Sequence, residues 1–370
     1  MALANLLQDK SRLAVAIAGT AVPILLLLLQ MALLHGVRTQ VTRLYEDFAF
    51  DIAVLPSTYE FMFSSGAFDR LRLAQAGAVP GVAGIFSLNV RGGSWTSAED
   101  RRSPIILIGM DDDAAFIADP DLRQGLSRLD RADAVLMDRF SSRNLGALEA
   151  GVSGRLNDRG VGIAGQFELG MFFYADGAVA MRNADLPRFA SGNGRAVSFG
   201  LLRLDPGASP EEVSRRLGEV LPADVRVVTR SELIEGERAF FLSTKPLGIM
   251  VTSGMLVAFL AGAVVLWQVL SAEIMRRLHE FSTLSAMGFS RIFVLGVGFC
   301  ETFFLGLAAV LPAMFAGGLI LQVLQSATHL PAAVTPLLLL QVFAIVMAMC
   351  AICAISVLRR IAGAKSTSLF

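Results

Sequence analysis

The stretch LAVAIAGTAVPILLLLLQMALL, residues 13–34, contains no charged side chain over 22 residues. A helix needs roughly 20 apolar residues to cross the hydrocarbon core of a bilayer, so this stretch is long enough to span a membrane. Pro23 lies inside it, which a membrane helix tolerates because neighbouring groups satisfy the freed carbonyl. The run exceeds the apolar core of a cleaved signal peptide, and no clear small-residue cleavage site follows it. We therefore interpret it as an uncleaved anchor.

Three more long apolar stretches lie near the end of the sequence, at residues 247–270, 291–325 and 336–358. The stretch at 291–325 carries Glu301 and Pro312 and is longer than one crossing requires, so we expect it to bend or break near the proline or to extend past the membrane surface. A mean hydropathy of +0.59 with 17% charged residues also favours an integral membrane protein. The sequence thus predicts four transmembrane α-helices with a large domain inserted between the first and the second.

Basic residues beside the spans predict the orientation, because short cytoplasmic loops are enriched in lysine and arginine. Those next to the spans are Lys10, Arg12, Arg276, Arg277, Arg291, Arg359, Arg360 and Lys365. The expected order is a cytoplasmic N-terminus (1–12), span 13–35, outer domain 36–246, span 247–270, cytoplasmic segment 271–290, span 291–325, outer loop 326–335, span 336–358 and cytoplasmic tail 359–370. The outer domain has 24 basic and 28 acidic residues, so it lacks the net positive charge that is typical of nucleic-acid-binding domains.

The outer domain has the pattern of an α+β fold. Expected strands are 51–55, 82–90, 104–110, 134–137, 162–167, 197–204 and 225–229, and expected helices are 36–48, 68–75 and one beginning after Ser209. Gly92 and Gly93 are interpreted as a turn between two of these strands. Ser209 and Glu212 have the spacing of a helix-capping box, with Pro210 at the first helical position. These elements predict two αβ lobes, with residues 111–195 inserted between them.

The residue types needed for catalysis are scarce. The three histidines, His35, His279 and His329, all lie outside the expected outer domain, which excludes a Ser-His-Asp device or a histidine-based zinc site there. No lysine follows a glycine-rich phosphate loop, so the chain is not its own P-loop ATPase.

Two other groups of residues have a functional and a structural interpretation. Asp111, Asp112 and Asp113 could be a cation site, but they lack the ligand spacing of a calcium loop, so a solvated turn at a strand end is favoured. Cys350 and Cys353 form a C-x-x-C pair within an expected membrane helix, where a role in helix packing is favoured over redox chemistry.

The cytoplasmic segment 271–290 is the sharpest local motif. Phe281, Leu284 and Met287 lie three residues apart and form an apolar ridge on a helix that Gly288 ends. By pattern alone the ridge fits an amphipathic helix on the membrane surface and a docking helix for a cytoplasmic partner equally well.

The sequence of segment 271–290 resembles that of the MacB/FtsX-type permeases of ABC transporters, and within them that of the DevC-type permeases of heterocyst glycolipid exporters. The sequence RLHEFSTLSAMG at 277–288 is similar to the family's signature before the third span, and Glu301 follows in a similar context. Weaker matches in the outer domain occur in the family's order, at residues 135–139, 165–170, 176–177 and 227–233.

The resemblance implies a non-catalytic, homodimeric permease in the bacterial inner membrane, paired with a separate ATPase that binds ATP and Mg, so that no cofactor or metal is expected in this chain. It implies that the domain 36–246 is periplasmic and that a periplasmic adaptor and an outer-membrane channel take part in exporting a lipid or other hydrophobic substrate. The expected ATPase-coupling residues are Arg277, Glu280, Phe281, Leu284, Ala286, Met287 and Gly288.

Two alternatives stay open: a signalling scaffold like FtsX that regulates a cell-wall hydrolase, and a lipoprotein-releasing permease. For Glu301, an acid within an expected span, we favour a structural or coupling role over proton relay.

Overall fold

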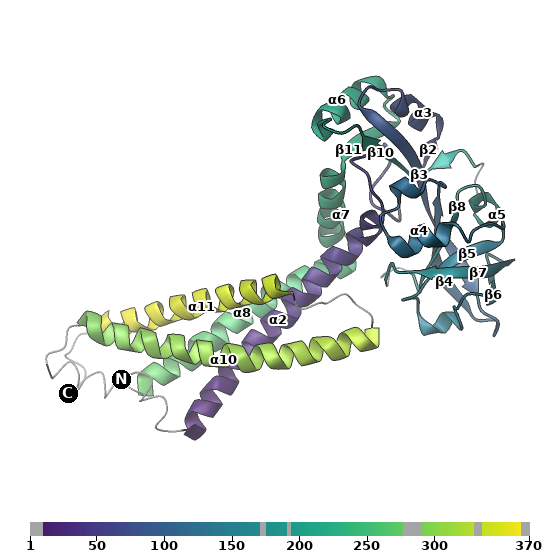
Figure 1. Ribbon diagram of the computed structural model, residues 1–370. Helices are drawn as coiled ribbons and strands as arrows, with labels where there is room; N and C mark the ends of the chain where they lie inside the picture. Colours follow the sequence, from purple (N-terminus) through teal and green to yellow (C-terminus); the bar gives the residue numbers. More distant parts are fainter. Residues whose placement is uncertain are drawn as a thin grey trace. The chain divides into compact units, whose positions relative to one another are not determined.

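The computed structural model describes residues 10–170, 175–190, 194–276, 287, 291–328 and 335–363. The chain divides into two compact units (Figure 1). The first contains the apolar helices, and the second spans Arg38–Lys245. Helix α2 (Lys10–Glu46) is continuous, with its residues up to Val37 in the first unit and the rest in the second.

The first unit is built from α2, α8 (Pro246–Arg276), α10 (Arg291–Thr328) and α11 (Pro336–Gly363). Within the described residues, α2, α8 and α10 each contain a stretch long and apolar enough to cross a membrane, whereas the apolar part of α11, Pro336–Ile352, is shorter. The expected span 291–325 lies in one helix, α10, which runs through Pro312 without a break. At about 1.5 Å per residue its 38 residues exceed the roughly 30 Å of one crossing.

Small residues allow these helices to approach closely. A Cβ on Gly317 of α10 would lie 2.5 Å from the Leu28 side chain of α2, and one on Gly262 of α8 would lie 3.5 Å from Pro23. The buried cluster between α2, α10 and α11 includes Leu28, Ala309, Val342 and Cys350. Small side chains at helix contacts are the usual means of packing inside a membrane, where no hydrophobic effect drives helices together.

The second unit is organised around a nine-stranded sheet of order β11-β1-β10-β3-β4-β8-β5-β7-β6. Its strands are β1 (Ile52–Pro56), β3 (Val82–Thr96), β4 (Arg102–Met110), β5 (Ala134–Asp138), β6 (Ser153–Leu156), β7 (Arg159–Phe167), β8 (Ala178–Arg182), β10 (Phe199–Leu204) and β11 (Val225–Thr229). The pairs β4·β8 and β5·β7 are parallel and the others antiparallel. The short strands β2 (Phe68–Asp69) and β9 (Ala196–Val197) pair separately.

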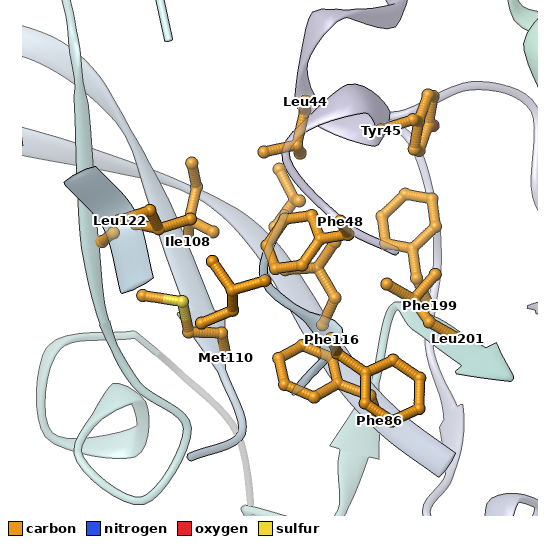
Figure 2. Close-up of a cluster of buried hydrophobic side chains, with 14 of the residues drawn as sticks. Leu44, Tyr45, Phe48, Phe86, Ile108, Met110, Phe116, Leu122, Phe199 and Leu201 are labelled. Atoms are coloured by element: carbon orange, nitrogen blue, oxygen red, sulfur yellow. The ribbon is translucent and has the colours of Figure 1, made fainter. Parts of the chain in front are cut away.

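Strand residues alternate between two buried faces. In β4, Ile106, Ile108 and Met110 join the largest core cluster, while Ile105 and Leu107 join a cluster on the opposite face. Figure 2 shows the first cluster, where Leu44, Tyr45 and Phe48 contribute with side chains from β3, β4 and β10. A strand buried on both faces reads as a nearly continuous apolar run, which explains the sequence IILIGM of β4.

Helices cover both faces of the sheet. The end of α2, α4 (Pro120–Leu126) and α7 (Arg230–Thr244) contribute to the largest cluster, together with the 3-10 helix Ala114–Phe116. On the opposite face, α3 (Leu71–Gly77) and α6 (Pro210–Val220) cover β1 and β10, and α5 (Leu186–Phe189) packs beside β4 and β8. A second 3-10 helix, Arg143–Leu145, contributes Leu145 to the same buried cluster as Leu186 and Phe189 of α5.

Two sequence expectations need correction. The expected turn at Gly92 and Gly93 is wrong, because β3 continues to Thr96 in register with β4. Gly93 is needed inside the strand, since a Cβ there would lie 2.9 Å from the Leu107 side chain. The expected helix 68–75 begins as the short strand β2 and becomes helical at Leu71. The strands of both expected lobes, and those of the stretch between them, share one sheet.

Two helix starts show how local sequence fixes the elements. Ser209 caps α6 by accepting a hydrogen bond from the Glu212 N–H, with Pro210 at the first turn as expected. Thr229 and Glu232 form a complete capping box at the start of α7, in addition to the cap expected at Ser209.

Candidate functional site

Most of the expected ATPase-coupling residues lie outside the described residues. These are Arg277, Glu280, Phe281, Leu284, Ala286 and Gly288. Met287 is described and is 62% exposed. Helix α8 continues through Arg276, directly before the segment. Glu301 is part of helix α10, but the structure does not describe its side chain.

The best-defined candidate site is a polar joint in the second unit, where the end of α2 meets α7. The Tyr45 hydroxyl lies 3.0 Å from the Tyr59 hydroxyl, which donates a hydrogen bond to Glu237 Oε1. The backbone N–H of Met62 donates to Glu237 Oε2 at 3.3 Å. Tyr45 belongs to α2, Glu237 to α7, and Tyr59 and Met62 to the loop after β1, so one carboxylate connects three segments. We call these residues, with Arg230 and Arg238, the α2–α7 joint.

Two arginines of α7 add contacts to the backbone of α2. Arg238 donates to the Arg38 carbonyl at 3.3 Å and to the Thr42 hydroxyl at 3.2 Å. Arg230 donates to the Tyr45 carbonyl at 3.1 Å. The last turn of a helix leaves carbonyls without intrahelical partners, and Arg230 satisfies one of them. The joint therefore fixes α7 against α2 over two turns of the α2 helix.

Glu237 is the electrostatic centre of the joint. Its side chain is only 3% exposed, and burial raises its pKa to about 7 despite the hydrogen bonds from Tyr59 and Met62. The same burial, with the nearby Glu237 charge, raises the pKa of the Tyr59 hydroxyl well above its ordinary value. Glu237 is thus held close to the point where it exchanges a proton at neutral pH.

Two further buried acids lie near the end of α2. Burial raises the pKa of Asp47 to about 7 and that of Asp138 to about 6. Asp138 Oδ1 accepts from the backbone N–H groups of Phe140, Leu169 and Gly170, which ties the end of β5 to the end of β7. The Ala118 N–H donates to the Asp47 carbonyl at 2.8 Å. These contacts anchor the loops around the end of α2.

The α2–α7 joint was not predicted from the sequence, although the spacing of residues in α7 indicates a buried acid. Leu233, Glu237 and Phe241 are spaced four residues apart and all three are buried in α7. An acid in line with two apolar positions on one helix face indicates a buried carboxylate that needs partners. The identity of those partners, Tyr45 and Tyr59, depends on the tertiary fold.

The acidic run at the end of β4 has structural partners. Asp111 accepts hydrogen bonds from Ser87 and Asn183, Asp112 pairs with Arg182 at 3.1 Å, and Asp113 caps the following 3-10 helix. Among the described residues no group of histidine, cysteine and acidic side chains could hold a metal ion. The three aspartates directly follow β4, and each has a hydrogen-bond or ion-pair partner there.

Comparison with known protein families finds a match for the apolar part of the chain. Residues 252–365 match the family described as FtsX-like permease C-terminal. No curated protein matches the chain.

Three solved structures are similar to it. The extracellular domain of the noncanonic ABC-type transporter YknZ from Gram-positive bacteria covers 48% of this chain and 98% of that one, at 13% identity and a TM-score of 0.34. The periplasmic region of MacB from Actinobacillus actinomycetemcomitans covers 53% and 96%, at 8% identity and a TM-score of 0.37. A domain of a putative permease protein from Porphyromonas gingivalis covers 50% and 88%, at 19% identity and a TM-score of 0.32.

With identities and TM-scores this low, the assignment of the chain rests on the match over residues 252–365, together with helices long and apolar enough to cross a membrane. The chain is a membrane protein, and its residues 252–365 form a domain of the family described as FtsX-like permease C-terminal.

Proposed function

We propose that this chain is the permease subunit of a DevC-like ABC export system. It crosses the inner membrane four times with both termini in the cytoplasm and works as a homodimer. A separate ATPase supplies ATP hydrolysis, and the domain 36–246 moves in the periplasm to pass a lipid or other hydrophobic substrate to an adaptor and an outer-membrane channel. The chain itself binds no cofactor, and Glu301 has a structural or coupling role.

The α2–α7 joint is the observation that carries this proposal. Helix α2 contains the first apolar stretch, and α7 ends at Thr244, so that only Lys245 separates it from the apolar helix α8. Both helices are held in the domain by the buried hydrogen bonds of the Tyr59 hydroxyl with Tyr45 and Glu237 and by the hydrogen bond that Arg238 donates to Thr42. Displacement of either helix would therefore be passed to the β-sheet as a rigid-body motion.

The end of α7 is also held firmly. Lys245 follows the last turn of α7, and its ammonium group lies 3.8 Å from the centre of the Phe61 ring and 5.3 Å from that of Phe240. A cation over two aromatic faces is attracted by both rings. This contact supports a stiff connection rather than a hinge inside the domain.

The segment 277–288 is proposed to dock on the ATPase through Phe281, Leu284 and Met287. The double variant Leu284→Glu, Met287→Glu would place two negative charges on the apolar ridge. Removing these charges from water on docking is unfavourable. We expect the double variant to insert in the membrane normally while losing ATPase stimulation and export, measured with the ATPase and permease reconstituted together. The matched control is Ser282→Glu, which lies on the opposite side of the same helical pattern. Unchanged stimulation in the double variant would remove the docking role.

The match to an FtsX-like domain supports a second candidate equally well, a signalling scaffold whose outer domain controls a cell-wall hydrolase. The two candidates differ in what ATP hydrolysis achieves. Export predicts ATP-dependent release of a hydrophobic substrate from vesicles that contain the complex. A scaffold predicts hydrolase activation without such release.

A further inference from the structure

One face of strand β3 carries a polar stripe inside an otherwise apolar sheet. Its even positions, such as Phe86, Leu88 and Val90, belong to the largest core cluster. The odd positions Ser87, Asn89 and Arg91 face the other side. The two apolar clusters of that side gather around α3 and α6 at one end of the sheet and around Trp95 and α5 at the other. The polar stripe forms the floor between them.

This floor is a fixed hydrogen-bond network. Asn89 Nδ2 donates to Asn183 Oδ1 at 2.9 Å, and Asn89 Oδ1 accepts from the Ser198 N–H at 3.0 Å. Asn183 Nδ2 donates to the Ser87 carbonyl at 2.8 Å and to Asp111 Oδ1 at 3.0 Å. Because these amides are held on both sides, the floor is preorganised, which reduces the entropy that a ligand would lose on binding.

Gly109 makes room for this network. It lies opposite Asn89 in the β3·β4 register, and a Cβ there would lie 2.6 Å from Asn183 Oδ1 and 2.8 Å from the Leu186 side chain. The glycine thus lets Asn183 and α5 approach the sheet. The result is a small, open pocket with a cavity volume of about 30 Å³, lined by polar residues of β3 and by apolar residues of α5 and β9.

Two arginines line the pocket, and their charges are compensated differently. Arg70 forms an ion pair with Asp111 at 3.0 Å. The half-buried Arg91 donates from Nη1 only to the Ser198 hydroxyl at 2.6 Å and to the Val90 carbonyl at 3.2 Å, and no carboxylate of the described residues pairs with it. Desolvation lowers the pKa of its guanidinium, with no acid nearby to oppose that shift.

A desolvated guanidinium without a counter-ion is unfavourable unless a ligand supplies the negative charge. Arginine presents its N–H groups in a planar fork that matches carboxylate and phosphate oxygens, and hydrogen bonds between such ionised partners are the stronger kind. Arg91 has donors left for such a ligand, because only Nη1 is engaged. The apolar wall beside it, which includes Leu186 and Val197, suits a few carbon atoms attached to the charged group.

We propose that this pocket, lined by Arg91, Asn89 and Asn183, binds a small anion carrying a carboxylate or phosphate group. This site would give the domain a ligand of its own, separate from the substrate of export. Its binding reaction is non-covalent, and its specificity comes from the guanidinium of Arg91, whereas the charge of Arg70 is paired with that of Asp111.

The test is arginine footprinting of the full chain in a maltoside detergent, which contributes no phosphate. Phenylglyoxal modifies accessible guanidinium groups, and mass spectrometry of the peptides gives the rate at each arginine. Inorganic phosphate and acetate are titrated separately at constant ionic strength with chloride as the balancing anion. We expect a saturable fall in the Arg91 rate, about tenfold when the anion reaches about ten times its dissociation constant.

Arg203 is the internal control. It lies on β10, donates to the Ala115 carbonyl at 3.1 Å and has no acid partner among the described residues, but it does not line the pocket. Its modification rate should not respond to either anion. A fall at Arg203 equal to that at Arg91, or no saturable fall at Arg91 with either anion, would overturn the proposal.

The phosphate and acetate titrations together identify the charged group of the ligand. Protection by phosphate alone indicates a phosphorylated ligand, and protection by acetate alone indicates a carboxylate. A second measurement uses the variants Arg91→Gln and Arg203→Gln. The protecting anion should raise the thermal midpoint of the wild type and of Arg203→Gln but not of Arg91→Gln. An equal rise in Arg91→Gln would contradict the site even if protection were observed.

Discussion

At the level of single residues, Glu237 makes the stability of the domain depend on pH. Its pKa is raised from an ordinary 4.5 to about 7, so the folded protein holds this proton more tightly than the unfolded chain does. The contribution of the site to stability is therefore greatest below about pH 4.5 and is lost as the pH rises through about 7. Asp47 and Asp138, whose pKa values are also raised, act in the same direction.

Glu237→Gln tests this assignment. The glutamine amide can accept from the Met62 N–H through its oxygen and donate to Tyr59, whose hydroxyl then turns toward Tyr45, so we expect the variant to fold. Relative to wild type it should gain stability as pH rises from 5 to 7, by about 1.4 kcal/mol per pH unit. The measurement is the thermal midpoint of the full chain against pH. The matched control is Glu235→Gln on the same helix, where the side chain is exposed. A Glu237→Gln curve parallel to wild type would contradict the assignment.

A second prediction at this scale concerns Gly154 in β6. A Cβ there would lie 2.2 Å from Trp95 Cζ2, and the Trp95 ring is fully buried with its Nε1 donating to the Leu145 carbonyl at 3.1 Å. We expect Gly154→Ala to destabilise the domain by about 1–3 kcal/mol, because the ring cannot move aside. Gly160→Ala in the adjacent β7 is the control, since nothing lies within 4 Å of a Cβ there. Equal denaturation midpoints for the two variants would show that Trp95 packs differently.

At the scale of elements, close helix contact organises the apolar unit. Gly317 and Gly318 are adjacent in α10, yet only a Cβ on Gly317 would meet the Leu28 side chain, at 2.5 Å. Alanine favours a helix over glycine by about 1 kcal/mol, so Gly318→Ala should be neutral or stabilising. Gly317→Ala should lower the thermal midpoint in detergent, because Leu28 is fully buried and cannot move away. If Gly317→Ala proved as stable as Gly318→Ala, α2 and α10 would not pack as described.

The elements also show what the sequence could predict. The apolar helices follow from length and charge alone, and α6 from its capping residues. The turn at Gly92 and Gly93 was predicted wrongly, because glycine usually marks turns whereas these two sit in a strand opposite Ile106 and Ile105. Nothing local distinguishes the two cases, since the need for Gly93 comes from the Leu107 side chain of the neighbouring strand.

Pairing over long sequence distances was equally hidden. Strand β1 pairs with β10 and β11, which follow it by more than 140 residues, and β10 separates β1 from β3. The sequence indicated each of these strands but not their order. For the same reason the α2–α7 joint could not be predicted, because the tertiary fold brings Tyr45 and Glu237 together from positions about 190 residues apart.

For the chain as a whole, the proposed export mechanism requires that the domain 36–246 and the segment 277–288 lie on opposite sides of one membrane. Basic residues beside the spans and the absence of lysine and arginine from 326–335 favour this arrangement. If it is correct, an ATPase in the cytoplasm can act on α8 and α10, while α2 and α7 pass the displacement to the sheet.

Cysteine accessibility tests this claim most directly. The native Cys300, Cys350 and Cys353 are first replaced by serine, and single cysteines are then introduced by Glu219→Cys on α6 and by Met287→Cys, both at exposed positions. With only the outer membrane permeabilised, an impermeant maleimide should label the position 219 variant. The position 287 variant should react only after the inner membrane is opened. Labelling of both variants from the same side of the inner membrane would contradict the account.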